Sequence, residues 1–236
     1  VLLRLRSGEQ LWQRIEAGLP PTAVTQFALE GFVAYGKTLV YSAQEYNSPR
    51  RWFLSFDQGD RWEEINPRQR DYGGQVQSLF VFQGKLFLDL SGSGLVVSSD
   101  NGRTWQLQPI GTFSYSTSVS TMLSVGGTLF AGLQGYYYSQ DNGVGIGVFR
   151  STDSGRNWDE VNTGLTNGGT IPALVTSEMD IYVPASWNLL TSDKEGQSWR
   201  KLNQALPQAL RLYRGGGYQN GMAAGGKALI ACCGSE

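Results

Sequence analysis

An all-β fold built from a repeated four-stranded unit is the fold class that this 236-residue sequence predicts. Three observations predict it. A polar box that ends in tryptophan recurs along the chain, a short run of β-branched and aromatic residues recurs out of phase with it, and the apolar residues show no helical periodicity. Self-similarity at a period of roughly 40 to 50 residues is typical of propellers and related arrays.

The box has the pattern S-x-D-x-G-x-x-W and is clearest as STDSGRNW at 151–158. It recurs as SFDQGDRW (55–62) and SSDNGRTW (98–105), and with one inserted residue as TSDKEGQSW (191–199). A worn copy, RSGEQLW (6–12), keeps only a glycine and the tryptophan. Successive tryptophans are 50, 43, 53 and 41 residues apart, at Trp12, Trp62, Trp105, Trp158 and Trp199.

The second repeated element is a strand that opens with a turn signal, as strands in hairpins do. Its copies are GKTLVYSA (36–43), GKLFLDLS (84–91), GGTLFAGL (126–133), EMDIYVPA (178–185) and GKALIACC (226–233). Another apolar stretch precedes most copies, and a third runs directly into the box. Each unit therefore holds four strands, A to D, with the box as the C–D turn and D starting at the tryptophan. Four strands per repeat favour a β-propeller over a sandwich.

The two ends of the chain predict how the ring is completed. Residues 1–15 form a strand C, a turn and a strand D, whereas the chain finishes with a weak strand A near 211–224 and a strand B at 226–233. Together these halves complete one blade, which gives five blades in a single domain, 1–236, closed by strands from both termini. The alternative is a fragment of a larger ring, divided between strands B and C.

Composition excludes several classes of function. Hydrophobic residues make up 40% of the chain and aromatics 12%, which is enough for a packed core. The net charge is −1 and the basic residues are scattered, so we expect no nucleic-acid partner. No apolar run is long enough to cross a bilayer, so we expect no transmembrane segment. The chain starts at Val1 rather than Met, and we expect a mature or excised piece whose targeting information is missing.

The chain contains no histidine, which removes Ser–His and Cys–His nucleophiles, most zinc sites and the commonest general base. The only cysteines are the neighbours Cys232 and Cys233. Adjacent strand residues point to opposite faces, which favours two inert thiols over a vicinal disulfide or a metal site. We expect no metal and no cofactor, while the redox state of the two thiols stays open.

The box itself predicts a braced turn. Asp153 can accept hydrogen bonds from backbone amides ahead of it, Gly155 supplies a positive φ, and Ser151 adds a local bond. Trp158 is expected to bury its ring against the neighbouring blade. The inserted Glu195 predicts a distorted turn in the last box. The expected structural set is Ser55, Asp57, Gly59, Trp62, Ser98, Asp100, Gly102, Trp105, Ser151, Asp153, Gly155, Trp158, Asp193, Gly196 and Trp199.

Two chemical interpretations compete with the structural one. A calcium loop needs a dense set of oxygens, but each box holds one acid at its fixed position and lacks the distant bidentate glutamate. An acid/base site rarely needs four copies of one constellation around a ring. The structural interpretation is therefore favoured.

The boxes resemble Asp-box repeats, also called BNR repeats, and GVFRSTDSGRNWDEVNTGL (147–165) resembles the blades of the photosystem II assembly and stability factor group. Some blade element matches from residue 4 to 233. Sialidases, xyloglucan-degrading glycosidases, sortilin-type receptors and lectins share the box. The resemblance implies that the box lies on the rim away from the binding face, and that the protein is extracytoplasmic or secreted. The five blades expected here differ from the blade numbers of the sialidases and of the assembly-factor group.

The opposite rim, formed by the B–C and D–A loops, is the expected binding face, because those loops are long and aromatic. The candidate ligand-binding residues are Trp187, Tyr46, Tyr72, Tyr115, Tyr137, Tyr213, Arg68 and Arg211. Exposed aromatics can stack on sugars or anchor a protein, whereas the alternative is that they pack the loops on themselves. The expected partner is a protein or a carbohydrate, and the oligomeric state stays open.

A glycosidase needs two carboxyl groups across a cleft. The weak catalytic candidates are Asp89, Glu45 and Asp71. Asp89 interrupts an apolar strand B, where it could point into the channel, outward, or toward a hydrogen-bond partner. No F/Y-R-I-P segment marks a sialidase arginine. The sequence favours a non-catalytic binding or scaffold module, with an exo-acting glycoside hydrolase of sialidase-like type as the alternative.

Overall fold

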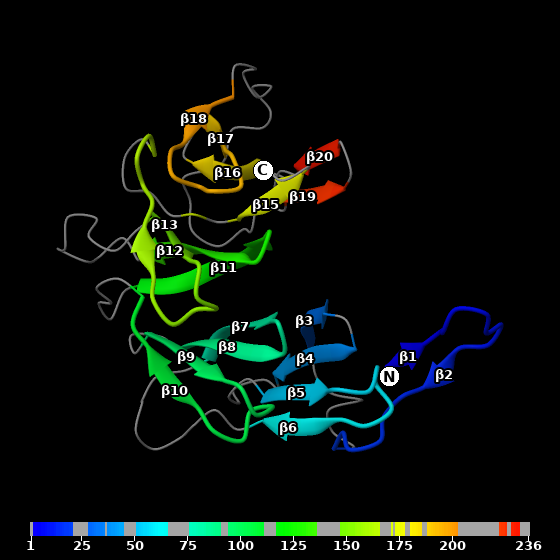
Figure 1. Cartoon of the computed structure of the whole chain (residues 1–236). Coiled ribbons are helices and arrows are strands. Elements are labelled where there is room, and N and C mark those ends of the chain that lie inside the picture. Colours follow the sequence, from blue (N-terminus) through cyan, green and yellow to red (C-terminus); the bar gives the residue numbers. More distant parts are fainter. Residues whose placement is uncertain are drawn as a thin grey trace. The chain divides into compact units, whose positions relative to one another are not determined.

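The computed structural model describes fourteen stretches of the chain. They are residues 2–20, 28–35, 37–44, 51–65, 76–90, 94–110, 117–135, 147–165, 171, 173–177, 180–185, 188–202, 222–225 and 228–231. Every regular element in them is a strand (Figure 1). The all-β prediction is confirmed. Within the same residues, no helical segment has the length and apolar character that a bilayer crossing requires.

Four sheets have four antiparallel strands each, in up-and-down order. Sheet 1 is β3 (Ala28–Tyr35), β4 (Thr38–Gln44), β5 (Arg51–Ser55) and β6 (Glu63–Ile65). Sheet 2 is β7 (Val76–Phe82), β8 (Lys85–Leu90), β9 (Gly94–Ser98) and β10 (Gln106–Gln108). Sheet 3 is β11 (Thr117–Val125), β12 (Thr128–Gly135), β13 (Gly147–Ser151) and β14 (Asp159–Glu160). Sheet 4 is β15 (Val175–Ser177), β16 (Asp180–Ala185), β17 (Asn188–Ser192) and β18 (Arg200–Lys201).

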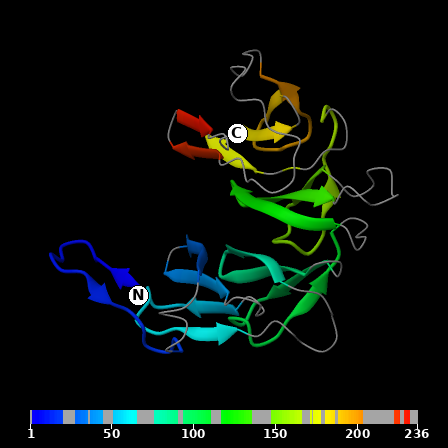
Figure 2. The same cartoon turned by 180° about the vertical axis from the view of Figure 1, so that it is seen from behind.

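Two shorter sheets have two strands each. They are β1 (Leu3–Arg4) with β2 (Gln13–Arg14), and β19 (Met222–Gly225) with β20 (Ala228–Ala231). In the described residues each of these pairs is a separate sheet. The predicted strands A to D are therefore confirmed in four units, whereas the number of blades and the closure of the ring stay predictions. In both views β19 lies beside β15 (Figure 1, Figure 2).

The chain divides into two compact units. The first comprises residues 1–71, 81–86 and 98–105, and the second comprises 72–80, 87–97 and 106–236. The division runs through sheet 2 and assigns its box, 98–105, to the unit that holds sheet 1.

Burial follows strand position within each sheet. The middle strands β5 and β9 are buried along almost their whole length, because both faces are covered, and they are correspondingly apolar. The outer strands β6, β14 and β18 are short and carry exposed charges: Glu-Glu, Asp-Glu and Arg-Lys. Charged, short edge strands oppose pairing with other chains.

Each unit has a core that draws on neighbouring sheets. In the first unit, Ile15 follows β2 and packs with Tyr41, Phe53 and Trp62 of sheet 1. The Tyr41 ring lies 5.8 Å from that of Phe53 and 6.2 Å from that of Trp62, in an edge-on arrangement with the indole. In the second unit, Val161 of sheet 3 belongs to the same cluster as Trp199 of sheet 4. Contacts between consecutive sheets therefore contribute to the apolar burial that stabilises each unit.

Candidate functional site

The three intact boxes share one hydrogen-bond network with the serine at its centre. In the box at 151–158, Oγ of Ser151 donates to Oδ1 of Asp153 at 2.8 Å and accepts the amide of Gly155 at 2.9 Å. Oδ1 of Asp153 accepts the amides of Arg156 and Asn157 at 3.0 and 2.9 Å. The carboxylate of Asp153 therefore accepts hydrogen bonds from the turn that follows it.

The other two intact boxes repeat these bonds. Oγ of Ser55 donates to Asp57 at 2.7 Å and accepts the amide of Gly59 at 2.7 Å. Oγ of Ser98 donates to Asp100 at 2.8 Å and accepts the amide of Gly102 at 2.8 Å. Sequence reasoning assigned the central role to the aspartate, whereas the serine hydroxyl also takes part in three hydrogen bonds in each intact box.

Each intact box turns through two consecutive residues with positive φ. In the box at 151–158 these are Ser154 (φ 61°) and Gly155 (φ 83°). The glycine is required for space as well as for φ, because a Cβ there would lie 2.6 Å from the Phe87 ring of sheet 2. A Cβ at Gly59 would lie 2.8 Å from Ile15, and one at Gly102 would lie 3.0 Å from Ile65. Each box glycine is thus pressed against the sheet that precedes it in the chain.

The box with the inserted residue has a different turn, as the position of Glu195 predicted. Oγ of Ser192 donates to the carbonyl of Ser198 at 2.6 Å and makes no bond to Asp193 among the hydrogen bonds of the described residues. Asp193 instead accepts the amides of Glu195 and Gly196 at 3.0 and 3.1 Å. Gly196 still packs against the preceding sheet, through Phe130.

The box tryptophans fall into two kinds. The indole N–H of Trp199 donates to the carbonyl of Val161, on the preceding sheet, at 2.7 Å. Those of Trp105 and Trp158 donate to the glycine carbonyls of their own boxes at 3.1 and 3.2 Å. Trp158 is only half-buried and so departs from the expectation that its ring would be buried against the neighbouring blade. Trp12 of the worn box is 64% exposed.

A Gly-Leu loop after strand D, which sequence reasoning missed, contacts the backbone of two box tryptophans. The amide of Trp62 donates to the carbonyl of Ala17, and the amide of Trp199 to that of Thr163, both at 2.8 Å. Gly18 and Gly164 follow those carbonyls with φ of 89° and 87°. The signal in the sequence is the repeat of x-G-L, as AGL at 17–19 and TGL at 163–165. At the same distance from the box tryptophan, the other two repeats read PRQ at 67–69 and IGT at 110–112, of which the second keeps the glycine but not the leucine.

The same two junctions carry an arginine from strand C. Nη1 of Arg4 donates to the carbonyl of Gln58 at 2.6 Å, and Nη1 of Arg150 donates to that of Glu195 at 2.9 Å. Both carbonyls stand immediately before a box glycine. We call a junction with both the arginine and the Gly-Leu loop a clamped junction.

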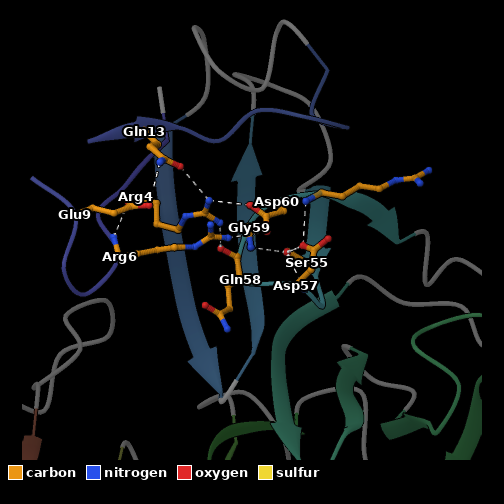
Figure 3. Close-up of polar contacts among 10 residues, drawn as sticks. Arg4, Arg6, Glu9, Gln13, Ser55, Asp57, Gln58, Gly59 and Asp60 are labelled. Carbon is orange, nitrogen blue, oxygen red and sulfur yellow. Dashed lines mark hydrogen bonds and ion pairs between the residues drawn. The ribbon is translucent and has the colours of Figure 1, made fainter. Parts of the chain in front are cut away.

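Figure 3 shows how the first clamped junction is extended by ion pairs. Asp60 accepts from Nη2 of Arg4 and Nη2 of Arg6, both at 2.7 Å. The hydrogen bond from Arg4, with a smaller contribution from Arg6, lowers the pKa of Asp60. The carboxylate is exposed, and pairs of this kind contribute little to stability. Their effect is to orient the arginine that holds the Gln58 carbonyl.

Hydrogen bonds keep the box carboxyls ionised. The side chain and amide of Thr104 hold the pKa of Asp100 at about 2, and the amide and side chain of Asn157 hold that of Asp153 at about 2. The amide of Arg61, followed by the Ser55 hydroxyl, lowers the pKa of Asp57. A general acid needs a proton near neutral pH, so these carboxylates are suited to bracing a turn rather than to proton transfer.

These lowered pKa values predict an acid-sensitive fold. An aspartate without such hydrogen bonds has a pKa of 3.8, whereas the pKa of Asp100 and of Asp153 in the folded chain is about 2. The stabilisation is therefore present above pH ~4 and is lost as the pH falls through ~2. We expect the thermal midpoint to fall between pH 4 and 2, and to fall less in a D100N/D153N variant. A D159N variant, altered at an exposed carboxylate of β14, is the control. An equal fall in all three proteins would contradict the prediction.

The predicted ligand-binding residues all lie outside the described residues. They are Trp187, Tyr46, Tyr72, Tyr115, Tyr137, Tyr213, Arg68 and Arg211. Glu45 and Asp71, two of the three weak catalytic candidates, lie outside them too, as do Cys232 and Cys233. Within the described stretches, no three acids, cysteines or histidines come together in a way that could hold a metal ion.

Asp89 is the one weak catalytic candidate that the structure describes. It is 0% exposed, so it opens neither onto solvent nor outward from the strand. Neither carboxyl oxygen has a hydrogen-bond partner of good geometry among the described residues. Burial raises the pKa of Asp89 to about 7, and the nearby backbone amide of Val119 offsets part of the rise.

No family model and no curated protein matches the sequence. Solved structures do match its fold. A GH74 xyloglucanase from Xanthomonas campestris has a TM-score of 0.55 at 15% identity, over 94% of this chain and 36% of that one. The extracellular domain of a putative one component system from B. thetaiotaomicron has a TM-score of 0.54 at 13% identity, over 80% of this chain and 23% of that one. An ancestral GH74 enzyme has a TM-score of 0.51 at 17% identity, over 83% and 26%.

The chain therefore shares the fold of these solved structures, and its described residues form four complete four-stranded antiparallel sheets that are consistent with propeller blades. It spans about a third or less of the length of these solved structures. At 13 to 17% identity the likeness concerns the fold alone.

Proposed function

We propose that the chain is a non-catalytic binding or scaffold propeller, which recognises a protein or a glycan through the face formed by its B–C and D–A loops. One observation supports this most. In the three intact boxes, serine and aspartate bond to their own turn, which leaves the repeated polar motif with a structural role. In an up-and-down blade the B–C and D–A loops lie at the strand ends opposite the C–D turn. The binding residues are therefore sought there.

A second candidate is an exo-acting glycoside hydrolase of sialidase-like type. One observation favours it: the carboxyl of Asp89 has a pKa of about 7, the range that suits a general acid. Its complete burial argues against it, because a general acid must reach the glycosidic oxygen. We therefore rank the binding module first.

The same proposal includes a single domain of five blades, outside the cytoplasm, with β19 and β20 completing the sheet of β1 and β2. The exposure of Leu3 supports a missing inner pair. By strand register Leu3 is equivalent to Phe53, Phe149 and Leu190, since each pairs with the second residue after its box tryptophan. Leu3 is 53% exposed, whereas the other three are 0 to 3% exposed. A larger ring, in which another blade supplies the inner strands, would cover Leu3 equally well.

Binding to defined probes tests the proposal. The probes are an array of sialylated and xyloglucan oligosaccharides and a displayed peptide library. We expect binding to at least one probe, weakened about tenfold or more by W187A or Y72A. Binding should be unchanged in R103A, which alters an exposed box residue at the other rim. Hydrolysis of an arrayed glycan that disappears in D89N would establish the hydrolase instead. Binding lost in R103A but kept in W187A and Y72A would overturn the choice of face.

A further inference from the structure

Asp89 occupies a position where the next sheet has no side chain at all. Strand β8 reads Lys-Leu-Phe-Leu-Asp-Leu from Lys85, and β12 reads Thr-Leu-Phe-Ala-Gly-Leu from Thr128, so that Asp89 is equivalent to Gly132. A Cβ at Gly132 would lie 2.6 Å from Ile171, which precedes strand β15 of the following sheet. At this position, strand B is in contact with the next blade. Asp89 therefore places a carboxyl at the junction between sheets 2 and 3.

Among the described residues, burial and the backbone of Val119 act on that carboxyl, and no counter-charge does. Strand β11 contributes the backbone amide of Val119, while the Val119 carbonyl already accepts a hydrogen bond from Oγ of Ser78 at 2.9 Å. Strands β7, β9 and β11 contain no ionisable residue, and the only other one in β8 is Lys85, at the far end. Of the flanking loops, 91–93 contain no ionisable residue and 111–116 contain only Tyr115. A carboxylate formed here would be desolvated with little compensation.

The same junction lacks the clamp that is found between sheets 3 and 4. The residue equivalent to Arg150 is Val97, and the segment equivalent to TGL reads IGT at 110–112, which has the glycine but not the leucine. The indole of Trp158 bonds to its own box rather than to sheet 2. Among the described residues, fewer hydrogen bonds cross the junction between sheets 2 and 3 than cross the clamped junctions. A change of charge at Asp89 is therefore opposed by fewer bonds there.

We propose that Asp89 makes the junction between sheets 2 and 3 a proton-controlled joint, which is tight when the carboxyl is neutral and opens locally when the carboxyl ionises. This inference is independent of what the loop face binds. Burial, with the Val119 amide as the one opposing group, raises the pKa of Asp89 from 3.8 to about 7. Because the folded pKa is the higher one, stability is fully present below pH ~4 and is lost as the pH rises through ~7.

Amide hydrogen exchange measures the opening directly. After correction for intrinsic exchange, we expect protection of β8 and β11 to fall on the order of 100-fold between pH 5 and pH 8, with little change in β16 and β17. Two variants should abolish this dependence of protection on pH. They are D89N and D89S, the second of which introduces the residue found at the equivalent position of sheet 1, Ser42. D159N should keep the dependence. Protection that does not change with pH in the native chain, or an equal fall in D89N, would overturn the proposal.

A titration of the native chain keeps the test valid if the variants fail to fold. The ¹³C resonance of the Asp89 carboxyl, followed across the acid and neutral pH range, should shift with a midpoint at about 7. The exchange of β11 amides should change over the same pH range. A carboxyl that titrates at the ordinary aspartate pKa of 3.8, or an exchange transition at a different pH from the carboxyl, would contradict the joint.

Discussion

Replacing Gly164 with alanine is expected to destabilise the chain by about 3 to 5 kcal/mol, which is at the top of the range for single substitutions. The backbone at Gly164 has φ of 87°, and a Cβ there would overlap the carbonyl oxygen of Trp199. Neither side can move away easily. The amide of Trp199 is bonded to the carbonyl of Thr163, and its ring is 4% exposed in the core. Relief of the overlap would break that bond and move Trp199 of sheet 4 away from sheet 3.

Urea unfolding of G164A beside G127A measures this effect. Gly127 has φ of 89°, almost the same as Gly164, but a Cβ there would meet nothing within 4 Å. G127A should therefore cost only the backbone strain, about 1 to 2 kcal/mol. The difference between the two variants isolates the close approach of the loop to the next box. Equal losses would mean that the Gly-Leu loop does not hold the following blade.

Replacing Trp199 with alanine is expected to cost about 3 to 5 kcal/mol, whereas the same change at Trp12 should stay within about 0.5 kcal/mol. Both tryptophans end a box in the sequence. Trp199 is buried and donates to Val161 across the junction at 2.7 Å, whereas Trp12 is 64% exposed. Trp158, half-buried over its own box, should lie between them, because its removal leaves the preceding sheet intact.

Thermal or urea unfolding of the three alanine variants, followed by circular dichroism, gives this order. W199F separates the two contributions of the side chain. It keeps most of the ring burial and loses the hydrogen bond to Val161, for an expected cost of about 1 to 3 kcal/mol, which includes the unpaired carbonyl. If W12A were as costly as W199A, the worn box would be as well packed as the intact ones and the exposed state of Trp12 would be wrong.

The strands were predictable from the sequence because their causes are local. Turn signals and alternating apolar residues placed strand B of sheet 3 at 126–133, and β12 runs from Thr128 to Gly135. The box turn was predictable for the same reason, since Ser151 and Asp153 bond within the next few residues. The strand order within four of the repeats is therefore predictable from the sequence alone.

The junctions between sheets were not predictable in this way, because the partners are distant in the sequence. Gly164 reads as an ordinary turn residue until its contact with Trp199, 35 positions later, is known. Asp89 could be singled out as an acid in an apolar strand, but its environment depends on Val119 of the next sheet. The candidate ligand residues of the loop face stay predictions, because they lie outside the described residues.

The position of the box glycines against the preceding sheet bears on how this repeat can be divided. The repeat in the sequence runs from strand A to strand D. The unit that packs together is offset from it, since the box at 98–105 groups with sheet 1 rather than with its own sheet. An excised or transplanted module that begins at strand A would leave its own box without a supporting surface. Boundaries drawn after a box, so that each sheet keeps the turn that rests on it, should yield the more soluble and cooperative pieces.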